Sequence, residues 1–258
     1  MVCGSPSLAQ ACRTIDDCQE ALAYHDDDDD GEGGAALPFL QFFNLWRTVA
    51  SVRDLCFGLG QTASVLLDVP SVCLYQDSVF SKRPQDGPTP WHIDARMAPF
   101  DTTHMVTFWI PLQDVPRGTT ALRFVSKSHN DYALPYWNPN HQGPEFQRLD
   151  RRYATAGGIQ HYMPLQLGDV TVHSGWTLHC ADAAPAATTT TRHAIAITYV
   201  DARAEIRENA MEFDKNNHGG YGDNEDQWSY KDWIHEVPTR KTFRHHLVPI
   251  VWPPQQQP

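Results

Sequence analysis

A histidine and an aspartate separated by one residue form the most informative motif of the chain, Trp91-His92-Ile93-Asp94. In an extended segment, residues i and i+2 point to the same face, so the imidazole of His92 and the carboxylate of Asp94 can reach one metal ion. Two histidines and one carboxylate on one side of a metal, with other positions open, are the ligands of non-haem Fe(II) oxygenases. The motif therefore predicts two of the three ligands of such a site.

The surroundings of the motif distinguish it from two other His-x-Asp pairs, which begin at His25 and His129. His25 runs directly into the acidic stretch 26–30, a charge run that is typical of a solvated segment. His129 lies in a polar, turn-like stretch. Only His92 precedes a long candidate strand, so we expect the metal site there.

A third ligand should come from a later strand. The segment 168–179 offers two candidates, His173 and His179. Residue chemistry does not separate them, because each histidine is equally compatible with metal binding and with a hydrogen-bonded role in the core.

Arg192 indicates a binding site for an anion. In a strand over residues 192–200, Arg192 shares a face with Ala194 and Ala196. An inward guanidinium followed by two small side chains leaves space for a dicarboxylate, which arginine binds through two parallel hydrogen bonds. The alternative is an arginine at the end of a strand that makes a surface ion pair.

The composition of the 258 residues is that of a globular protein with a net charge of −11. No basic block is present, which argues against a nucleic-acid partner, and no apolar run approaches the length of a membrane span. The N-terminus carries no signal-peptide pattern, and none of the six cysteines forms a C-x-x-C pair. We therefore expect a cytoplasmic protein with reduced thiols and a small-molecule substrate. The sequence makes no prediction about the oligomeric state.

The order of the expected elements is helices first and strands afterwards. We expect helices over 7–24 and 38–68, packed on the outside of a sheet. The expected strands, including a final strand or packed extension, cover 72–82, 103–112, 121–125, 170–172, 192–200 and 247–252. We expect little regular structure over 130–164, a long insertion of the kind that forms lids, and a short helix near 226–235. This order predicts a mainly β fold, a jelly roll or barrel with helices on one face.

These motifs, taken in order, resemble the phytanoyl-CoA dioxygenase (PhyH) family of Fe(II)- and 2-oxoglutarate-dependent oxygenases. The matching segments are Phe80-Ser81-Lys82-Arg83-Pro84, Trp91-His92-Ile93-Asp94, Thr107-Phe108-Trp109-Ile110-Pro111-Leu112, Ala121-Leu122-Arg123-Phe124 through Ser128-His129, Gly168-Asp169-Val170 through His179, and Arg192-His193-Ala194-Ile195-Ala196. They extend over about half of the chain, from 72 to 203. The aromatic-glycine strand with which family members open is not clear here, and the acidic run has no counterpart.

The resemblance implies a double-stranded β-helix in a single domain over 1–258, with its core at about 70–203 and a partly flexible segment 1–36. It implies that Fe(II) is bound by His92, Asp94 and His179, while His129 belongs to a structural turn. It also implies that 2-oxoglutarate is bound by Arg192, with Thr107 and Lys82 as further candidates. The candidates to line the substrate cavity are Gln76, Trp109, His173 and Trp176.

The implied reaction consumes O₂ and 2-oxoglutarate, releases succinate and CO₂, and hydroxylates a small organic molecule. Halogenating relatives replace the carboxylate ligand with a small residue, so the presence of Asp94 favours hydroxylation. Two rival interpretations are a cupin-like metal enzyme that does not use 2-oxoglutarate, such as an isomerase or hydrolase, and a non-catalytic jelly-roll binding protein. The first would not need Arg192, and the second would show no metal-dependent turnover.

Overall fold

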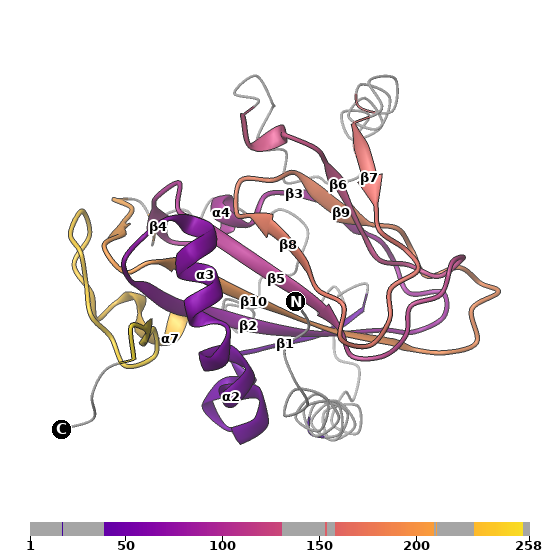
Figure 1. Cartoon of the computed structure of the whole chain (residues 1–258), viewed down its shortest axis with the longest axis horizontal. Coiled ribbons are helices and arrows are strands. Elements are labelled where there is room, and N and C mark those ends of the chain that lie inside the picture. Colours follow the sequence, from indigo (N-terminus) through magenta and orange to yellow (C-terminus); the bar gives the residue numbers. More distant parts are fainter. Residues whose placement is uncertain are drawn as a thin grey trace.

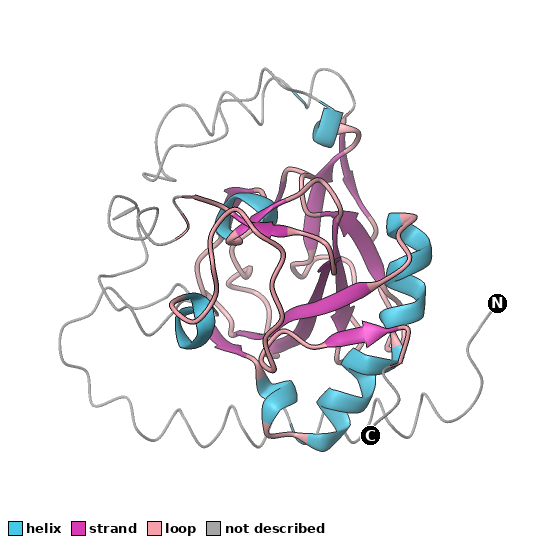
Figure 2. Ribbon diagram, turned by 90° about the vertical axis from the view of Figure 1, so that its left-hand side faces the viewer, coloured by secondary structure: helices cyan, strands magenta, loops and turns pink. Residues whose placement is uncertain are grey.

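The core of the fold consists of two antiparallel sheets that face each other (Figures 1 and 2). The computed structural model describes residues 39–130, 158–208 and 230–254, together with residues 17, 153 and 210. Within this part of the chain, the larger sheet has the strand order β1-β2-β10-β5-β8, with β12 also paired to β2, and the smaller sheet has the order β3-β9-β6-β7. The expected jelly roll, the double-stranded β-helix, is confirmed.

The strands of the larger sheet are β1 (Leu40–Phe43), β2 (Val72–Lys82), β5 (Met105–Pro111), β8 (Thr171–Ser174), β10 (Arg192–Asp201) and β12 (Ile250–Trp252). Those of the smaller sheet are β3 (Thr89–His92), β6 (Leu122–Val125), β7 (Ile159–His161) and β9 (His179–Ala181). The strands expected from the sequence all appear, with ends that differ by a few residues.

Two helices cover the outer face of the larger sheet, as expected (Figure 1). They are α2 (Ala50–Gly58) and α3 (Gly60–Leu67). Their buried residues pack against alternate residues of β2, β5 and β10, among them Val79, Phe108 and Ile197. Because side chains alternate along a strand, the residues between these apolar ones point to the inner face, where the pocket lies.

The expected helix over 38–68 is wrong in its first part. Leu40–Phe43 forms β1, which pairs with the middle and end of β2, and a short 3-10 turn, η1 (Leu45–Arg47), follows it. Asp77 holds this turn, because its carboxylate accepts the backbone N–H groups of Leu45 at 3.1 Å and Trp46 at 2.8 Å. The mostly apolar segment 39–43 is partly covered by a neighbouring strand, which helical periodicity does not take into account.

The expectation of little regular structure over 130–164 is also incomplete. Residues 159–161 form β7 at the edge of the smaller sheet, paired with β6. Residues 131–152 and 154–157 lie outside the described residues, as do most of the expected helix 7–24, the acidic run and residues 211–229. The expected lid is therefore not tested.

A third group of elements, which includes residues from the C-terminal part of the chain, packs beside the two sheets. The short strands β4 (Phe100–Asp101) and β11 (Glu205–Ile206) pair there, and α7 (Lys231–Ile234) lies within the expected helix. The rings of Trp233 and Phe243 stack with centroids 5.4 Å apart. In the described part of the chain, no helix is long and apolar enough to cross a membrane.

Candidate metal centre and its pocket

Two histidines face each other across the smaller sheet. β3 and β9 are antiparallel, and their pairing places His92 directly opposite His179, with ring centroids 4.0 Å apart. The Nδ1 atom of His92 lies 2.8 Å from the carbonyl of Pro90, and Nδ1 of His179 lies 2.9 Å from the carbonyl of Thr177. A carbonyl only accepts hydrogen bonds, so each Nδ1 carries the proton. The lone pair of each Nε2 is therefore available to a metal.

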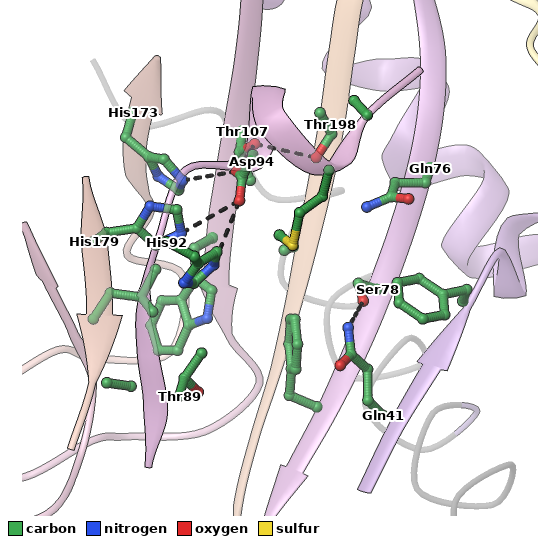
Figure 3. Close-up of a pocket in the computed structure, with 18 of the residues that line it drawn as sticks. Gln41, Gln76, Ser78, Thr89, His92, Asp94, Thr107, His173, His179 and Thr198 are labelled. Atoms are coloured by element: carbon green, nitrogen blue, oxygen red, sulfur yellow. Dashed lines mark hydrogen bonds and ion pairs between the residues drawn. The ribbon is translucent and has the colours of Figure 1, made fainter. Parts of the chain in front are cut away.

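Asp94 completes the cluster from outside the strand. β3 ends at His92, and Asp94 is the first residue of α4 (Asp94–Met97), so the two do not share a strand as expected. Ile93 between them is extended (φ −132°, ψ 117°), which still turns both side chains to one side. The carboxylate oxygen Oδ1 lies 3.6 Å from Nε2 of His92 and 3.4 Å from Nε2 of His179 (Figure 3). One ligand atom from each residue lies within 4.8 Å of the other two.

The start of α4 is fixed by the loop that precedes His179. The N–H of Ala95 donates to the carbonyl of Gly175 at 2.9 Å, and the N–H of Gly175 donates to Met105 at 2.7 Å. A Cβ atom at Gly175 would lie 2.7 Å from the side chain of Met105, so only glycine fits this approach. The same loop is held by Ser128, whose hydroxyl accepts the N–H of Leu178. This contact agrees with a structural turn around His129.

The second oxygen of Asp94 is held by the larger sheet. Thr107 and His173 are opposite each other on β5 and β8. The hydroxyl of Thr107 donates to Oδ2 of Asp94 at 2.7 Å, and Nε2 of His173 lies 3.2 Å from the same oxygen. An ionised carboxylate only accepts, so His173 carries its proton on Nε2. That nitrogen is therefore occupied in holding Asp94, whereas Nε2 of His179 is free to bind a metal.

The protonation states agree with this arrangement. Burial lowers the pKa of His92 and lowers that of His179 well below its usual value, so both rings are neutral at pH 7. Burial alone would raise the pKa of Asp94, but the neighbouring imidazoles of His179 and His173 and the hydrogen bond from His173 lower it below its usual value. The site therefore offers two neutral imidazoles and one carboxylate, the forms that metal binding requires.

Arg192 lies in the same pocket, on the inner face of β10. Its side chain is buried, with 7% of the residue exposed, and its guanidinium carbon is 5.3 Å from the centre of the Trp109 ring. Burial lowers the pKa of Arg192 to about 10, which leaves it charged at neutral pH. Its Nε has no hydrogen-bond partner among the described residues. The surface ion pair considered as an alternative is therefore excluded by the burial of the residue.

Lys82 places a second cation beside Arg192, because the two residues are partners across β2 and β10. Burial, and then the charge of Arg192, lowers the pKa of Lys82 to about 7. Its Nζ donates to the carbonyl of Asp182 at 3.1 Å and lies 4.8 Å from the ring centre of Phe39. Lys82 lines a small cavity next to the main pocket, and Arg192 lines both.

The main pocket has a volume of about 220 Å³. Of the expected lining residues, Gln76, Trp109 and His173 line it, as does Thr107. Trp176 does not, and its indole N–H donates instead to the carbonyl of Thr102 at 3.0 Å. Sequence reasoning missed the contribution of β1, since that segment was expected to be helical. The missed lining residues are Phe39, Gln41, Phe43 and, from β2, Ser78 and Phe80.

Comparison with solved structures gives proteins of the same fold. The carbocyclase SnoK from nogalamycin biosynthesis is 19% identical, with 92% of this chain and 87% of that chain covered and a TM-score of 0.64. The epimerase SnoN from the same biosynthesis is 20% identical, with 94% and 89% covered and a TM-score of 0.63. EctD from S. alaskensis is 15% identical, with 65% and 58% covered and a TM-score of 0.54.

At these identities, the similarity shows the fold alone. No curated protein matches the sequence. The family described as phytanoyl-CoA dioxygenase (PhyH) matches residues 13–194, which is more than half of the chain and includes the cluster around Asp94. The enzymes of this family use Fe(II), 2-oxoglutarate and O₂. The chain therefore belongs to the phytanoyl-CoA dioxygenase family and is a 2-oxoglutarate-dependent non-haem iron dioxygenase.

Proposed function

We propose that the chain hydroxylates a small organic molecule at an iron bound by His92, Asp94 and His179, with 2-oxoglutarate bound by Arg192. The observation that carries the proposal is the convergence of two imidazole lone pairs on one carboxylate oxygen. In both histidines, the other ring nitrogen is tied to a backbone carbonyl, at 2.8 and 2.9 Å. This second contact fixes the ring orientation and the tautomer of a metal-binding histidine.

The residues around the cluster fit Fe(II). Three protein ligands on one side, two imidazoles and one carboxylate, leave the opposite side open to the pocket. That is the facial arrangement of non-haem iron oxygenases. Thr107 and His173 contact Oδ2 of Asp94 and keep the carboxylate oriented, so that Oδ1 faces His92 and His179. When bound there, iron would supply the activation of O₂.

The residues around Arg192 fit 2-oxoglutarate. A buried guanidinium with an unpaired Nε, next to Lys82 across the strand pair, forms a cationic end to the pocket. An anion there offsets the repulsion between the two cations and satisfies the buried donor. Ala196 follows Arg192 on the same face and leaves room between the cationic end and the metal cluster.

The role of the protein in the reaction is to position the groups and to shield them. Arg192 and Lys82 would hold the distal carboxylate, and the two histidines and Asp94 would hold iron at the other end of the cosubstrate. Trp109 and Leu122 line this part of the pocket and would shield the space between them from water. The substrate would occupy the part of the pocket that faces β1.

Hydroxylation is proposed because Asp94 fills the position at which a halide would bind in a halogenating enzyme. Among proteins of this fold, SnoK is a carbocyclase and SnoN an epimerase, so the fold also accommodates other outcomes. The fate of the oxygen atoms therefore distinguishes hydroxylation from these alternatives.

The test is the formation of succinate from 2-oxoglutarate under labelled O₂, with the purified protein and Fe(II). One labelled oxygen should enter succinate even in slow turnover without substrate, and a second should enter the product once a substrate is known. Asp94→Ala should abolish most of the succinate, whereas Asp169→Ala, which changes an exposed turn, should not. A protein that holds Fe(II) but neither binds nor consumes 2-oxoglutarate would instead be a cupin-like metal enzyme.

A further inference from the structure

The half of the pocket that faces β1 carries no charge among the described residues. The charged side chains that line the whole pocket are Asp94 and Arg192, which the proposed function assigns to iron and 2-oxoglutarate. What is left is aromatic, aliphatic and amide or hydroxyl in character. The lining residues include the aromatic and thioether side chains Phe43, Tyr75, Phe80, Met97, Met105 and Tyr230, while the ring of Phe39 lies 4.8 Å from Nζ of Lys82. A charged group placed in this half would lose its hydration without gaining an ion-pair partner.

A row of polar side chains crosses the larger sheet into this half. His173 is opposite Thr107, Thr107 is opposite Thr198, and Thr198 is opposite Gln76. The hydroxyls of Thr107 and Thr198 are 3.1 Å apart, and Thr107 donates to Asp94. The row therefore connects the metal cluster at one end with Gln76 at the other.

Two members of the row have a buried atom without a hydrogen-bond partner among the described residues, Nδ1 of His173 beside the metal cluster and Oε1 of Gln76 at the far end. Figure 3 shows the carboxamide of Gln76 pointing from β2 into the pocket, on the side away from the histidines. A buried acceptor without a donor has lost its hydration and gained no hydrogen bond in return, so a ligand that supplies a donor there is favoured.

A second polar pair lies next to Gln76, two residues further along β2. Nε2 of Gln41 donates to the hydroxyl of Ser78 at 2.7 Å, which links β1 to β2 inside the pocket. This contact holds the carboxamide of Gln41 in place beside the rings of Phe43 and Phe80, which line the same half. The polar groups are thus few and oriented, and the remainder of the wall is apolar, as in small-molecule sites that select by hydrogen bonding.

We infer that this half of the pocket binds an uncharged, ring-containing substrate, and that Gln76 accepts a hydrogen bond from a hydroxyl or N–H group of that substrate. The inference rests on the proposed function and specifies its substrate class. Strands in a sheet lie about 4.8 Å apart, so Gln76 on β2 is roughly 10 Å from Thr107 on β5. The space between Gln76 and Thr107 therefore has about the length of one substituted ring.

Four probe molecules of one shape test the inference. They are para-ethylphenol, which is neutral with one donor; para-ethylanisole, which lacks the donor; tyramine, a cation; and para-hydroxyphenylacetate, an anion. Binding is measured by saturation-transfer NMR on the full chain loaded with Zn(II) and 2-oxoglutarate, since Zn(II) is diamagnetic and does not activate O₂. Para-ethylphenol should bind at least threefold more tightly than para-ethylanisole, because one neutral hydrogen bond corresponds to about three- to tenfold in affinity. It should also bind at least threefold more tightly than tyramine and para-hydroxyphenylacetate, because their charged groups would lose hydration without gaining an ion-pair partner.

Variants at Gln76 make the test specific. Gln76→Leu should remove the preference for para-ethylphenol over para-ethylanisole, and Gln76→Glu should reverse the order of para-ethylphenol and tyramine. Gln160→Leu, which changes an exposed glutamine on β7, is the matched control and should change neither preference. The variants should leave the dissociation constant of 2-oxoglutarate within twofold of that of the parent protein.

Two results would overturn the inference while leaving the proposed function intact. One is that charged probes bind as tightly as para-ethylphenol, or that para-ethylphenol does not bind at all. The other is that Gln76→Leu leaves all four affinities unchanged. In both cases 2-oxoglutarate would still bind and succinate would still form. Loss of 2-oxoglutarate binding in the parent protein would instead contradict the proposed function itself.

Discussion

At the scale of single residues, the two oxygens of Asp94 have different partners. Oδ1 faces the Nε2 atoms of His92 and His179, while Oδ2 accepts from Thr107 and lies against His173. One oxygen of Asp94 is therefore available to a metal, and the other holds the carboxylate in its orientation. His173 and His179 are the two histidines that residue chemistry left equivalent, and their hydrogen bonds make them different.

The first prediction concerns the metal. His92→Ala, Asp94→Ala and His179→Ala should each lose most of the binding of Mn(II), used in place of Fe(II), because each removes a ligand. His173→Ala should keep the site and weaken binding by about 10- to 100-fold, the usual effect of losing a residue that orients a ligand. Calorimetry on the metal-free protein measures both effects. If His173→Ala lost the metal and His179→Ala retained it, His173 would be the ligand and His179 the residue that orients Asp94.

The second prediction concerns Arg192. Arg192→Ala should weaken 2-oxoglutarate binding by roughly 2–4 kcal/mol, because it removes a charge-assisted, bidentate pair. Arg192→Lys should restore part of the affinity, since an ammonium group keeps the charge but lacks the planar fork. Arg203→Ala, which removes an exposed arginine paired with Asp201, is the control and should have no effect. Anaerobic calorimetry decides, and an unchanged affinity in Arg192→Ala would move the anchor to Lys82.

At the scale of elements, β1 depends on a buried carboxylate. Asp77 is completely buried on the outer face of β2 and accepts the first N–H groups of η1. These contacts hold the end of β1 against β2, which brings Gln41 and Phe43 into the pocket. The element that completes the proposed substrate site is therefore fixed from the opposite face of the sheet.

This arrangement predicts a particular pH dependence of stability. Burial raises the pKa of Asp77 to about 7, and the N–H groups of Trp46 and Leu45 oppose the shift only in part. The unfolded chain titrates near 4, so between about pH 4 and pH 7 the folded state binds more protons. The contribution of Asp77 to the free energy of unfolding is therefore largest below pH 4 and decreases by on the order of 3 kcal/mol as the pH rises to about 7.

Urea unfolding at several pH values measures this effect against Asp77→Asn, which does not titrate. As the pH rises through this window, the unfolding free energy of the parent protein should fall relative to that of Asp77→Asn. Asp86→Asn, at a more exposed position in the loop after β2, is the control. A difference that is constant from pH 4 to pH 7 would show that Asp77 is already ionised throughout.

At the scale of the whole molecule, the candidate site joins the two sheets. His92 and His179 come from the smaller sheet, whereas Thr107, His173 and Arg192 come from the larger one. Asp94, at the start of α4, lies between them and contacts both sets. A ligand in the site would therefore contact both layers and add to the polar contacts that Thr107 and His173 make with Asp94.

The molecule should accordingly be stabilised by its ligands. A metal at 100 times its dissociation constant adds about 2.7 kcal/mol, and for a chain of this size that corresponds to a rise in Tm of roughly 5–10 °C. 2-Oxoglutarate should add a further increase only when metal is present, because it would bind to both the metal and Arg192. Differential scanning fluorimetry with Mn(II) measures both steps. If Mn(II) raised the Tm of Asp94→Ala by the same amount, the metal would bind at a different site.

The sequence by itself determined the type of fold, because helices followed by short strands and turns are the order of a jelly roll with helices on one face. The limits of β2 and β10 could be predicted to within a residue, and alternation along a strand assigned one face to α2 and α3 and another to the pocket. Local spacing also placed His92 and Asp94 together, since an extended Ile93 turns both to one side. The inward direction of Arg192 followed from the same alternation.

Only the tertiary structure decided what depends on contacts between distant segments. β1 was mistaken for helix because its burial comes from β2, and β9 was missed because a three-residue strand has too few positions to show a period. The difference between His173 and His179 arises from their pairing with Thr107 and His92, residues far away in the sequence. The unpaired Oε1 of Gln76 likewise becomes visible only when the strands are assembled, because satisfaction of a hydrogen bond is a property of neighbours in space.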